Sequence, residues 1–339
     1  MLSLPLRLNR PNQGAESESV LSRIGNTPLF RLETVDRRFP SVSIYAKAEW
    51  LNPGGSVKDR AALRMILAAE ASGALASGRV ILDATSGNTG IGYAMIGAAR
   101  GYRVRLVMPG NTSLARRHIL RAYGAELTFT DPVLGMDGAI EGARKLAASD
   151  PGQFAYLNQY DNDENWRAHY DGTALEIWEQ SAGCVTHFVA ALGTSGSFTG
   201  TARRLRELNP RVKCVSVQPD SPFHGLEGMK HMASATVPRI YDPSLADDNI
   251  AVRTEDAYDW VKRLVREEGL LVGVSSGAAL AACIEVARSL PEGRNAMIVT
   301  IFPDHGEKYL GERFWEEPDA GDRARFPATR DGNAWGVRS

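Results

Sequence analysis

The sequence predicts an α/β protein of two three-layer domains with mostly parallel sheets. Its 339 residues exceed the usual size of one hydrophobic core, so the chain should divide into two domains with room for a cleft. Short apolar runs alternate with amphipathic stretches, which is the pattern of strand–helix units in a parallel sheet. Two loops rich in Gly, Ser and Thr, one in each half of the chain, each join a predicted strand to a predicted helix.

The apolar pattern predicts each element in turn. The predicted strands are Val80–Ala84, Val104–Met108, Leu127–Thr130, Phe154–Leu157, His187–Leu192, Lys213–Gln218 and Ala296–Ile301. The predicted helices are Asp59–Ala71, Gly90–Arg100, Ser113–Tyr123, Met136–Ala148, Asn165–Gln180, Phe198–Leu208, Glu255–Glu268 and Gly277–Ser289. The proline-punctuated stretch Ser221–Ala251 is predicted to be a long loop near the site.

Composition and charge exclude several classes of protein. Hydrophobic residues make up 43% and charged residues 23%, close to the averages of globular proteins. A net charge of -1 provides no field for a polyanion, so we expect no nucleic-acid partner. The N-terminus has no continuous apolar region of the kind a signal peptide needs, and no stretch approaches 18 apolar residues, so we expect a cytoplasmic protein with no membrane partner.

The three cysteines do not indicate a disulfide framework. Cys184, Cys214 and Cys283 are odd in number and widely spaced, and each lies in an apolar stretch that predicts burial. Cys184 and His187 are three apart, but no second pair completes a zinc site. We therefore expect no structural metal.

The loop Gly193-Thr194-Ser195-Gly196-Ser197 follows an apolar strand and opens a helix. Free N–H groups at a helix start bind anions, and the hydroxyls add donors, so this loop predicts a phosphate site. The Walker lysine is absent, so the phosphate need not belong to a nucleotide triphosphate. Taken alone, such a loop is more often a simple turn or helix cap.

The second loop is Thr85-Ser86-Gly87-Asn88-Thr89-Gly90, and its geometry is similar. Its N–H groups and the hydroxyls of Ser86 and Thr89 could hold a carboxylate, although an ordinary strand–helix turn is the alternative. Gly90-Ile91-Gly92 suggests a dinucleotide fingerprint, but Met95 stands where a third glycine or alanine is needed. That substitution weakens an interpretation based on NAD.

A Pro-Gly-Gly turn in Asn52–Arg60 delivers Lys58 to the start of a helix. The helix dipole opposes a cation there and lowers the pKa of the lysine, as a Schiff-base lysine requires. A single lysine is far more often a solvated surface group, so only the combination of motifs decides.

These three segments, followed by Gly273-Val274-Ser275-Ser276-Gly277-Ala278-Ala279, resemble the cysteine synthase and cystathionine β-synthase family of fold-type II pyridoxal-phosphate enzymes. The resemblance spans Val20 to Trp315 and includes Ile24-Gly25-Asn26-Thr27-Pro28-Leu29. It implies a fold like the β subunit of tryptophan synthase. Residues 20–49 and 159–315 would form a larger cofactor domain and 50–158 a smaller mobile domain, with a flexible N-terminus (1–19) and a C-terminal extension (316–339).

The resemblance also implies a role for each motif residue. Lys58 would carry pyridoxal 5′-phosphate as a Schiff base, Asn88 would contact the 3′-oxygen of the ring, and Ser275 would contact the pyridine nitrogen. The residues implied for the cofactor phosphate are Gly193, Thr194, Ser195, Gly196 and Ser197. Those implied for the substrate α-carboxylate are Thr85, Ser86, Gly87, Thr89 and Gln159.

The reaction implied is β-replacement on O-acetyl-L-serine or O-phospho-L-serine, in which sulfide or another sulfur donor adds to an aminoacrylate to give L-cysteine. A neutral serine cannot keep the ring nitrogen protonated, so the electron sink is weaker and loss of a β-substituent is favoured over transamination. The resemblance further implies a homodimer.

The stretch Gly225–Met232 is similar to the cysteine synthase B branch, where Lys230 would meet a substrate phosphate; the alternative is a solvated loop lysine. The sequence departs from the family pattern at Ala174-Leu175, where Gly-Pro is common, and at Ser195 and Ser197, where Gly and Thr are frequent.

Other functions remain open at this point. Within the family, cystathionine β-synthase would use homocysteine and a diaminopropionate synthase would use an amine. A short-chain dehydrogenase is the more distant alternative, because Tyr258 and Lys262 have the spacing of its acid–base pair.

Overall fold

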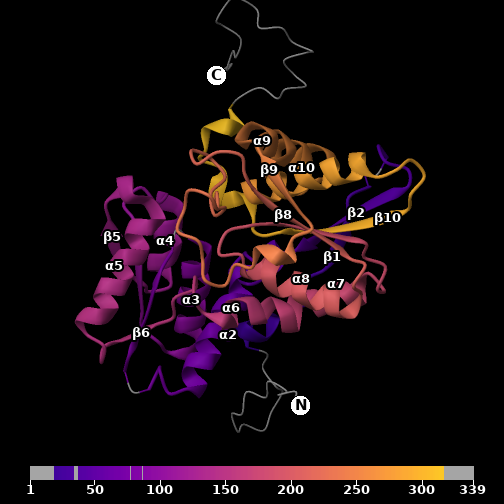
Figure 1. Cartoon of the computed structure of the whole chain (residues 1–339). Helices are drawn as coiled ribbons and strands as arrows, with labels where there is room; N and C mark the ends of the chain where they lie inside the picture. Colours follow the sequence, from indigo (N-terminus) through magenta and orange to yellow (C-terminus); the bar gives the residue numbers. More distant parts are fainter. Residues whose placement is uncertain (1–18, 34–36, 77, 86, 317–339) are drawn as a thin grey trace, which may run out of the picture.

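The computed structural model describes residues 19–33, 37–76, 78–85 and 87–316, which form two sheets (Figure 1). The larger sheet has the order β1-β2-β10-β7-β8-β9, and only β1 runs antiparallel to its neighbour. Its strands are β1 (Leu29–Arg31), β2 (Val42–Ala48), β7 (His187–Ala191), β8 (Lys213–Pro219), β9 (Asp248–Val252) and β10 (Ala296–Phe302). The smaller sheet is parallel, in the order β5-β4-β3-β6. Its strands are β3 (Val80–Ala84), β4 (Val104–Pro109), β5 (Glu126–Thr130) and β6 (Phe154–Tyr156).

Helices cover both faces of each sheet. On the larger sheet, α9 and α10 lie on one face and α7 and α8 on the other, while α5 lies on one face of the smaller sheet and α2, α3 and α4 on the other (Figure 1). The helices are α2 (Lys58–Ala71), α3 (Asn88–Arg100), α4 (Leu114–Ala122), α5 (Gly135–Ser149), α6 (Asp163–Ala168), α7 (Ala174–Gln180), α8 (Gly196–Leu208), α9 (Thr254–Arg263) and α10 (Val274–Ser289).

The hydrophobic pattern of β3 shows why the layers form. All five of its residues are buried; Ile81 packs toward α2 and α3, and its neighbours Val80 and Leu82 pack toward α5. A strand that is apolar on both faces requires cover on both faces. The prediction of an α/β fold with mostly parallel sheets is therefore confirmed, and all seven predicted strands are present.

The structure corrects the sequence interpretation in several places. It adds strands β1, β2 and β9, and β9 lies at the end of the stretch predicted to be a loop. The buried Lys47 interrupts the apolar pattern of β2, and β9 begins with two exposed polar residues, so neither showed a clear pattern. The predicted helix Asn165–Gln180 is divided by a wider π-helical turn at His169–Thr173.

All three cysteines are free, but burial was predicted wrongly for Cys184, which is exposed in the turn after α7. Ala182 and Gly183, two consecutive residues with positive φ, turn the chain just before Cys184. Cys184 is therefore not buried, although its neighbours in the sequence are apolar. Within the described ranges, no helix is long and apolar enough to cross a membrane. No cluster of His, Cys, Asp or Glu there could hold a metal ion.

The motifs meet where parallel strands end. The loops after β3, β7 and β10 all reach the space between the two sheets, which is the usual place for a ligand site in α/β proteins. The stretch after β8 closes over this space, since the N–H of Lys230 donates to the carbonyl of Leu192 at 2.8 Å.

Candidate active site

Lys58 is the first residue of α2, and the chain leading to it is fixed against the segment after β10. The N–H of Val57 donates to the carbonyl of Pro303 at 2.8 Å, and Gly55 adopts a φ of 75°, which favours glycine. Burial lowers the pKa of the Lys58 ammonium, and the nearby carboxylate of Asp304 partly opposes that effect. Its amine therefore reaches the neutral, nucleophilic form more readily than an exposed lysine would.

A small cavity of about 50 Å³ lies beside Lys58 and brings together the residues predicted to bind the cofactor. Its lining includes Lys58, Asn88, Gly193, Thr194, Ser195, Ser197 and Ser275. Gly196 supports this wall from behind, because a Cβ added there would lie 2.1 Å from Oδ1 of Asn165.

The loop after β7 forms an anion cradle at one end of this cavity. Helix α8 begins at Gly196 with no side-chain cap, so the N–H groups of its first turn have no partner within the helix. A Cβ at Gly193 would lie 2.3 Å from the carbonyl oxygen of Gly228, so only glycine allows the two loops to approach this closely. Thr194 accepts a hydrogen bond at 3.1 Å from Asn165 Nδ2, which leaves its hydroxyl hydrogen free. These features fit a phosphate group.

Ser195 adopts a left-handed backbone with a φ of 69° at the start of α8. A non-glycine residue in this conformation is strained by on the order of 1 kcal/mol. This conformation explains why glycine is frequent at this position of the family pattern.

Ser275 forms the other end of the cavity as the second residue of α10, which also begins without a side-chain cap. The positive end of the α10 dipole therefore lies next to its hydroxyl. A ring nitrogen bound here would meet a neutral partner in a positive field, and both discourage its protonation.

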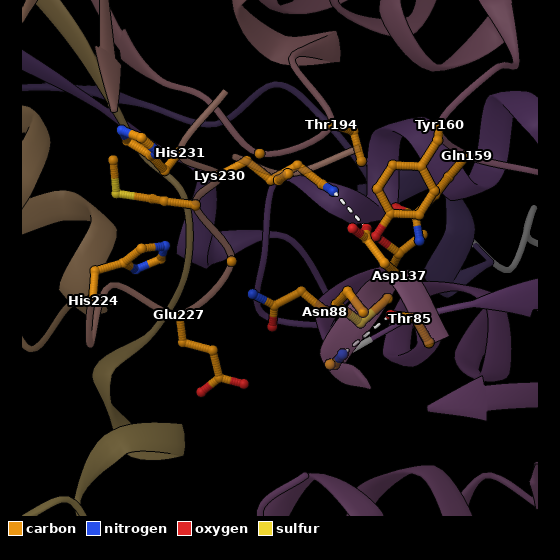
Figure 2. Close-up of a pocket in the computed structure, with 18 of the residues that line it drawn as sticks. Thr85, Asn88, Asp137, Gln159, Tyr160, Thr194, His224, Glu227, Lys230 and His231 are labelled. Carbon is orange, nitrogen blue, oxygen red and sulfur yellow. Dashed lines mark hydrogen bonds and ion pairs between the residues drawn. The ribbon is translucent and has the colours of Figure 1, made fainter. Parts of the chain in front are cut away.

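A second cavity of about 490 Å³ opens outward from Lys58, and the residues predicted to bind substrate line it (Figure 2). Thr89 donates to Gln159 Oε1 at 2.7 Å, and Gln159 in turn donates to the carbonyl of Ala84 at 2.6 Å, so both side chains are held in place. Thr85 accepts hydrogen bonds from two N–H groups of its own loop and shapes the start of α3. Gly87 lines the same cavity, and Ser86 lies outside the described residues.

Lys230 lines this cavity and points toward Asp137 and Tyr160 (Figure 2). Its Nζ lies 3.6 Å from Asp137 Oδ1 and 5.2 Å from the centre of the Tyr160 ring, and the side chain is only 10% exposed. Burial lowers its pKa, opposed by the Asp137 carboxylate. The alternative of a solvated loop lysine is wrong.

Several residues at the site were not predicted from the sequence as functional. Asp304 accepts a hydrogen bond from Asn88, Lys308 donates another to Asn88, and Arg116 pairs with Glu227 at the wall of the larger cavity. Asp304 follows the end of β10 just as the motif loops follow β3 and β7, and this placement could have predicted from the sequence that Asp304 lies at the site. Arg116 lies in an amphipathic helix, where the pattern alone indicates a solvated residue.

The pair suggesting a dehydrogenase lies elsewhere. Tyr258 in α9 donates to the carbonyl of Gly225 at 3.1 Å and stacks on Phe314 with ring centres 4.2 Å apart. Neither Tyr258 nor Lys262 lines either cavity described above. The dehydrogenase alternative is not favoured.

Comparisons with known proteins agree with this geometry. The model of the family described as "Pyridoxal-phosphate dependent enzyme" matches residues 20–304. Cysteine synthase of Aquifex aeolicus is 50% identical over 305 residues, covering 89% of this chain and 93% of the relative. Cysteine synthase B of Salmonella typhimurium is 44% identical over 287 residues, covering 85% and 92%. The crystal structure of cysteine synthase from Entamoeba histolytica superposes with a TM-score of 0.84 at 36% identity, covering 95% and 96%.

The matched residues include Lys58, both glycine-rich loops and Ser275, and end at Asp304. The chain therefore belongs to the family of pyridoxal-phosphate-dependent enzymes.

Proposed function

We propose that this chain is a cysteine synthase that replaces the acetoxy group of O-acetyl-L-serine by sulfide: the Cβ–O bond breaks, acetate leaves, and a Cβ–S bond forms. The observation that carries the proposal is the buried Lys58, which lines one small cavity together with an anion cradle and a neutral serine at the start of α10. The names of the relatives support cysteine formation over the cystathionine and diaminopropionate alternatives.

The residues of the small cavity would bind the cofactor in one orientation. The start of α8 would bind the phosphate of the cofactor, and Ser275 would contact its ring nitrogen. Asn88 would contact the 3′-oxygen, and Lys58 would bond to the carbonyl carbon. Pyridoxal phosphate, when bound, supplies an electron sink for the charge left as the α-proton departs. The neutral Ser275 would keep that sink weak, which favours loss of the β-substituent.

Lys58 would then act as the base. Its Nζ, released when the substrate amine takes its place, removes the α-proton and later returns a proton to the product. A buried amine with a lowered pKa suits both steps, because it gives up its proton more readily than an exposed lysine does.

The start of α3 would position the substrate. The backbone N–H groups of Asn88 and Thr89, at the start of α3, and the amide of Gln159, held by Thr89, would bind the α-carboxylate in the larger cavity. Binding there would draw the smaller domain, residues 50–158, over the cleft and exclude water.

A direct assay tests the activity. Purified enzyme with added pyridoxal phosphate is given O-acetylserine with sulfide, homocysteine or an amine, and each product is quantified by mass spectrometry. We expect cysteine as the main product and none from Lys58→Ala, which should still bind some cofactor through the anion cradle. Normal turnover by Lys58→Ala, or a main product other than cysteine, would contradict the proposal.

We further propose that O-phospho-L-serine is accepted alongside or in preference to O-acetylserine, with Lys230 as the partner of its phosphate. The largely buried position of Lys230 in the lining of the cavity supports this, because a phosphate dianion would compete well with its present partners, the Asp137 carboxylate and the Thr236 carbonyl.

Steady-state kinetics with both donors test the role of Lys230. Lys230→Ala should raise the KM for phosphoserine more than that for acetylserine, because only the phosphate ester loses a charge partner. Lys145→Ala, a change at a lysine that is 75% exposed on α5, is the matched control. Equal effects on both donors, or no phosphoserine turnover by the parent enzyme, would refute the assignment.

We also propose a homodimer located in the cytoplasm. Phe30 of the edge strand β1 and the nearby Leu51 are both exposed, at 39% and 51%, which offers an apolar surface for a second copy. Sedimentation velocity should give a dimer, and a monomer at micromolar concentration would exclude it.

A further inference from the structure

A buried carboxylate that belonged to none of the predicted sites lies at the centre of this one. Asp304 follows β10 and is 1% exposed. Its backbone forms an antiparallel bridge with Ser56, two residues before Lys58, and its neighbour Pro303 accepts the N–H of Val57. The segment after β10 therefore carries Asp304 directly against the turn that positions Lys58.

The side chain of Asp304 determines how Asn88 is oriented. Oδ2 of Asp304 accepts hydrogen bonds from Asn88 Nδ2 and from the hydroxyl of Tyr309, both at 2.8 Å. The ammonium of Lys308 donates to the other end of the same amide, Asn88 Oδ1, at 2.7 Å. A flipped amide would place its oxygen against a carboxylate and its NH₂ against an ammonium, so one orientation is strongly favoured.

Asp304 is also the main counter-charge of Lys58. Burial lowers the pKa of Lys58, and the carboxylate of Asp304 raises it most strongly; the buried Glu49, which pairs with Arg60, raises it less. The same carboxylate raises the pKa of Lys308 against burial, so two lysines share it. Arg116, the third cation nearby, pairs with Glu227 and interacts more weakly with the Asp304 carboxylate.

We propose that Asp304 is a positioning residue that fixes the orientation of Asn88 and stabilises the protonated form of Lys58. In the proposed reaction Lys58 has to hold a proton between removing it from the substrate and returning it to the product. A carboxylate beside the amine favours that protonated state, while the fixed Asn88 amide keeps its second Nδ2 hydrogen available for the cofactor.

The first test measures Lys58 directly in the full chain freed of cofactor. Its reaction with trinitrobenzenesulfonate is followed from pH 6 to 11 by mass spectrometry of the Lys58 peptide, so the readout does not depend on turnover. Asp304→Asn should lower the midpoint by about one to three pH units, the usual effect of a close opposite charge. The amide oxygen can still accept both hydrogen bonds, and Oδ1, which has no hydrogen-bond partner among the described residues, loses none.

Glu307→Gln is the matched control, because its side chain is 74% exposed in the same segment, and it should leave the midpoint unchanged. Lys308→Met provides a second variant of opposite sign: it removes one of the cations that share the carboxylate with Lys58 and should raise the midpoint. If Asp304→Asn does not fold, the midpoint of Lys308→Met by itself tests the proposal. An unchanged midpoint in folded Asp304→Asn, or an unchanged or lowered one in Lys308→Met, would overturn the proposal.

Asp304→Asn and Lys308→Met should also weaken equilibrium binding of pyridoxal phosphate, since each removes a charge that orients Asn88. This inference rests on the proposed role of Lys58, yet the two can fail separately. Absence of cysteine formation by the parent enzyme would reject the proposed function and leave the labelling result standing.

Discussion

Replacing Gly193 by alanine should weaken cofactor binding, because the backbone of Gly193 lies too close to that of Gly228 for a side chain to fit between them. The added Cβ would lie 2.3 Å from the carbonyl oxygen of Gly228, whereas ordinary van der Waals contact begins near 3.4 Å. The two loops must therefore separate by about 1 Å, and neither contact atom is a side chain that could rotate away. Overpacking of this kind costs about 1 to 3 kcal/mol. Without the cofactor, the loop after β7 can relax around the added methyl group. A bound phosphate holds this loop in place, so the substitution should weaken cofactor binding and raise the Kd by roughly 5- to 150-fold.

The Kd is measured by titrating cofactor-free protein with pyridoxal phosphate and following the visible absorption band. Gly311→Ala is the control, because a Cβ at Gly311 meets no atom within 4 Å. We expect the control to bind as the parent does. A folded Gly193→Ala protein with the parent Kd would show that the approach of the two loops does not shape the phosphate site.

Three further predictions follow from the same geometry. Ser275→Asp should favour a protonated ring nitrogen, shift the visible spectrum and slow β-replacement; an unchanged rate and spectrum would count against the ring-nitrogen role. Glu176→Gln should lower the free energy of unfolding at pH 7, measured in urea, by about 3 kcal/mol, because it breaks the buried ion pairs of Glu176 with Arg60 and Lys47. Burial raises the pKa of Glu176, but Arg60 and Lys47 outweigh it and hold the value at about 2, below the ordinary 4.5. That stabilisation is thus present above pH 4.5 and lost as pH falls toward 2, so the gap between variant and parent should narrow in acid. Crystals with and without a substrate analogue should show the loop Thr85–Thr89 moving over the cleft, and an unmoved loop would reject closure.

Much of the fold and of the cofactor site could be predicted because its signals are local. A mostly apolar run such as Val80–Ala84, in which only Asp83 is polar, indicates a buried strand within five residues. The Gly, Ser and Thr loop that follows indicates a helix start without a side-chain cap. β9 and the π-helical turn His169–Thr173 were missed because exposed polar residues and a wider turn carry no periodic signal.

The sequence by itself determined the fold class, the family and the motif residues that line the small cavity with Lys58. Only the tertiary structure decided that Asn88 meets Asp304, 216 residues away along the chain, that Lys230 is buried beside Asp137, and that Cys184 is exposed. The physical reason is that spacing along the chain specifies local backbone geometry. Contacts between distant side chains depend on how all the helices and strands pack, and no short segment contains that information.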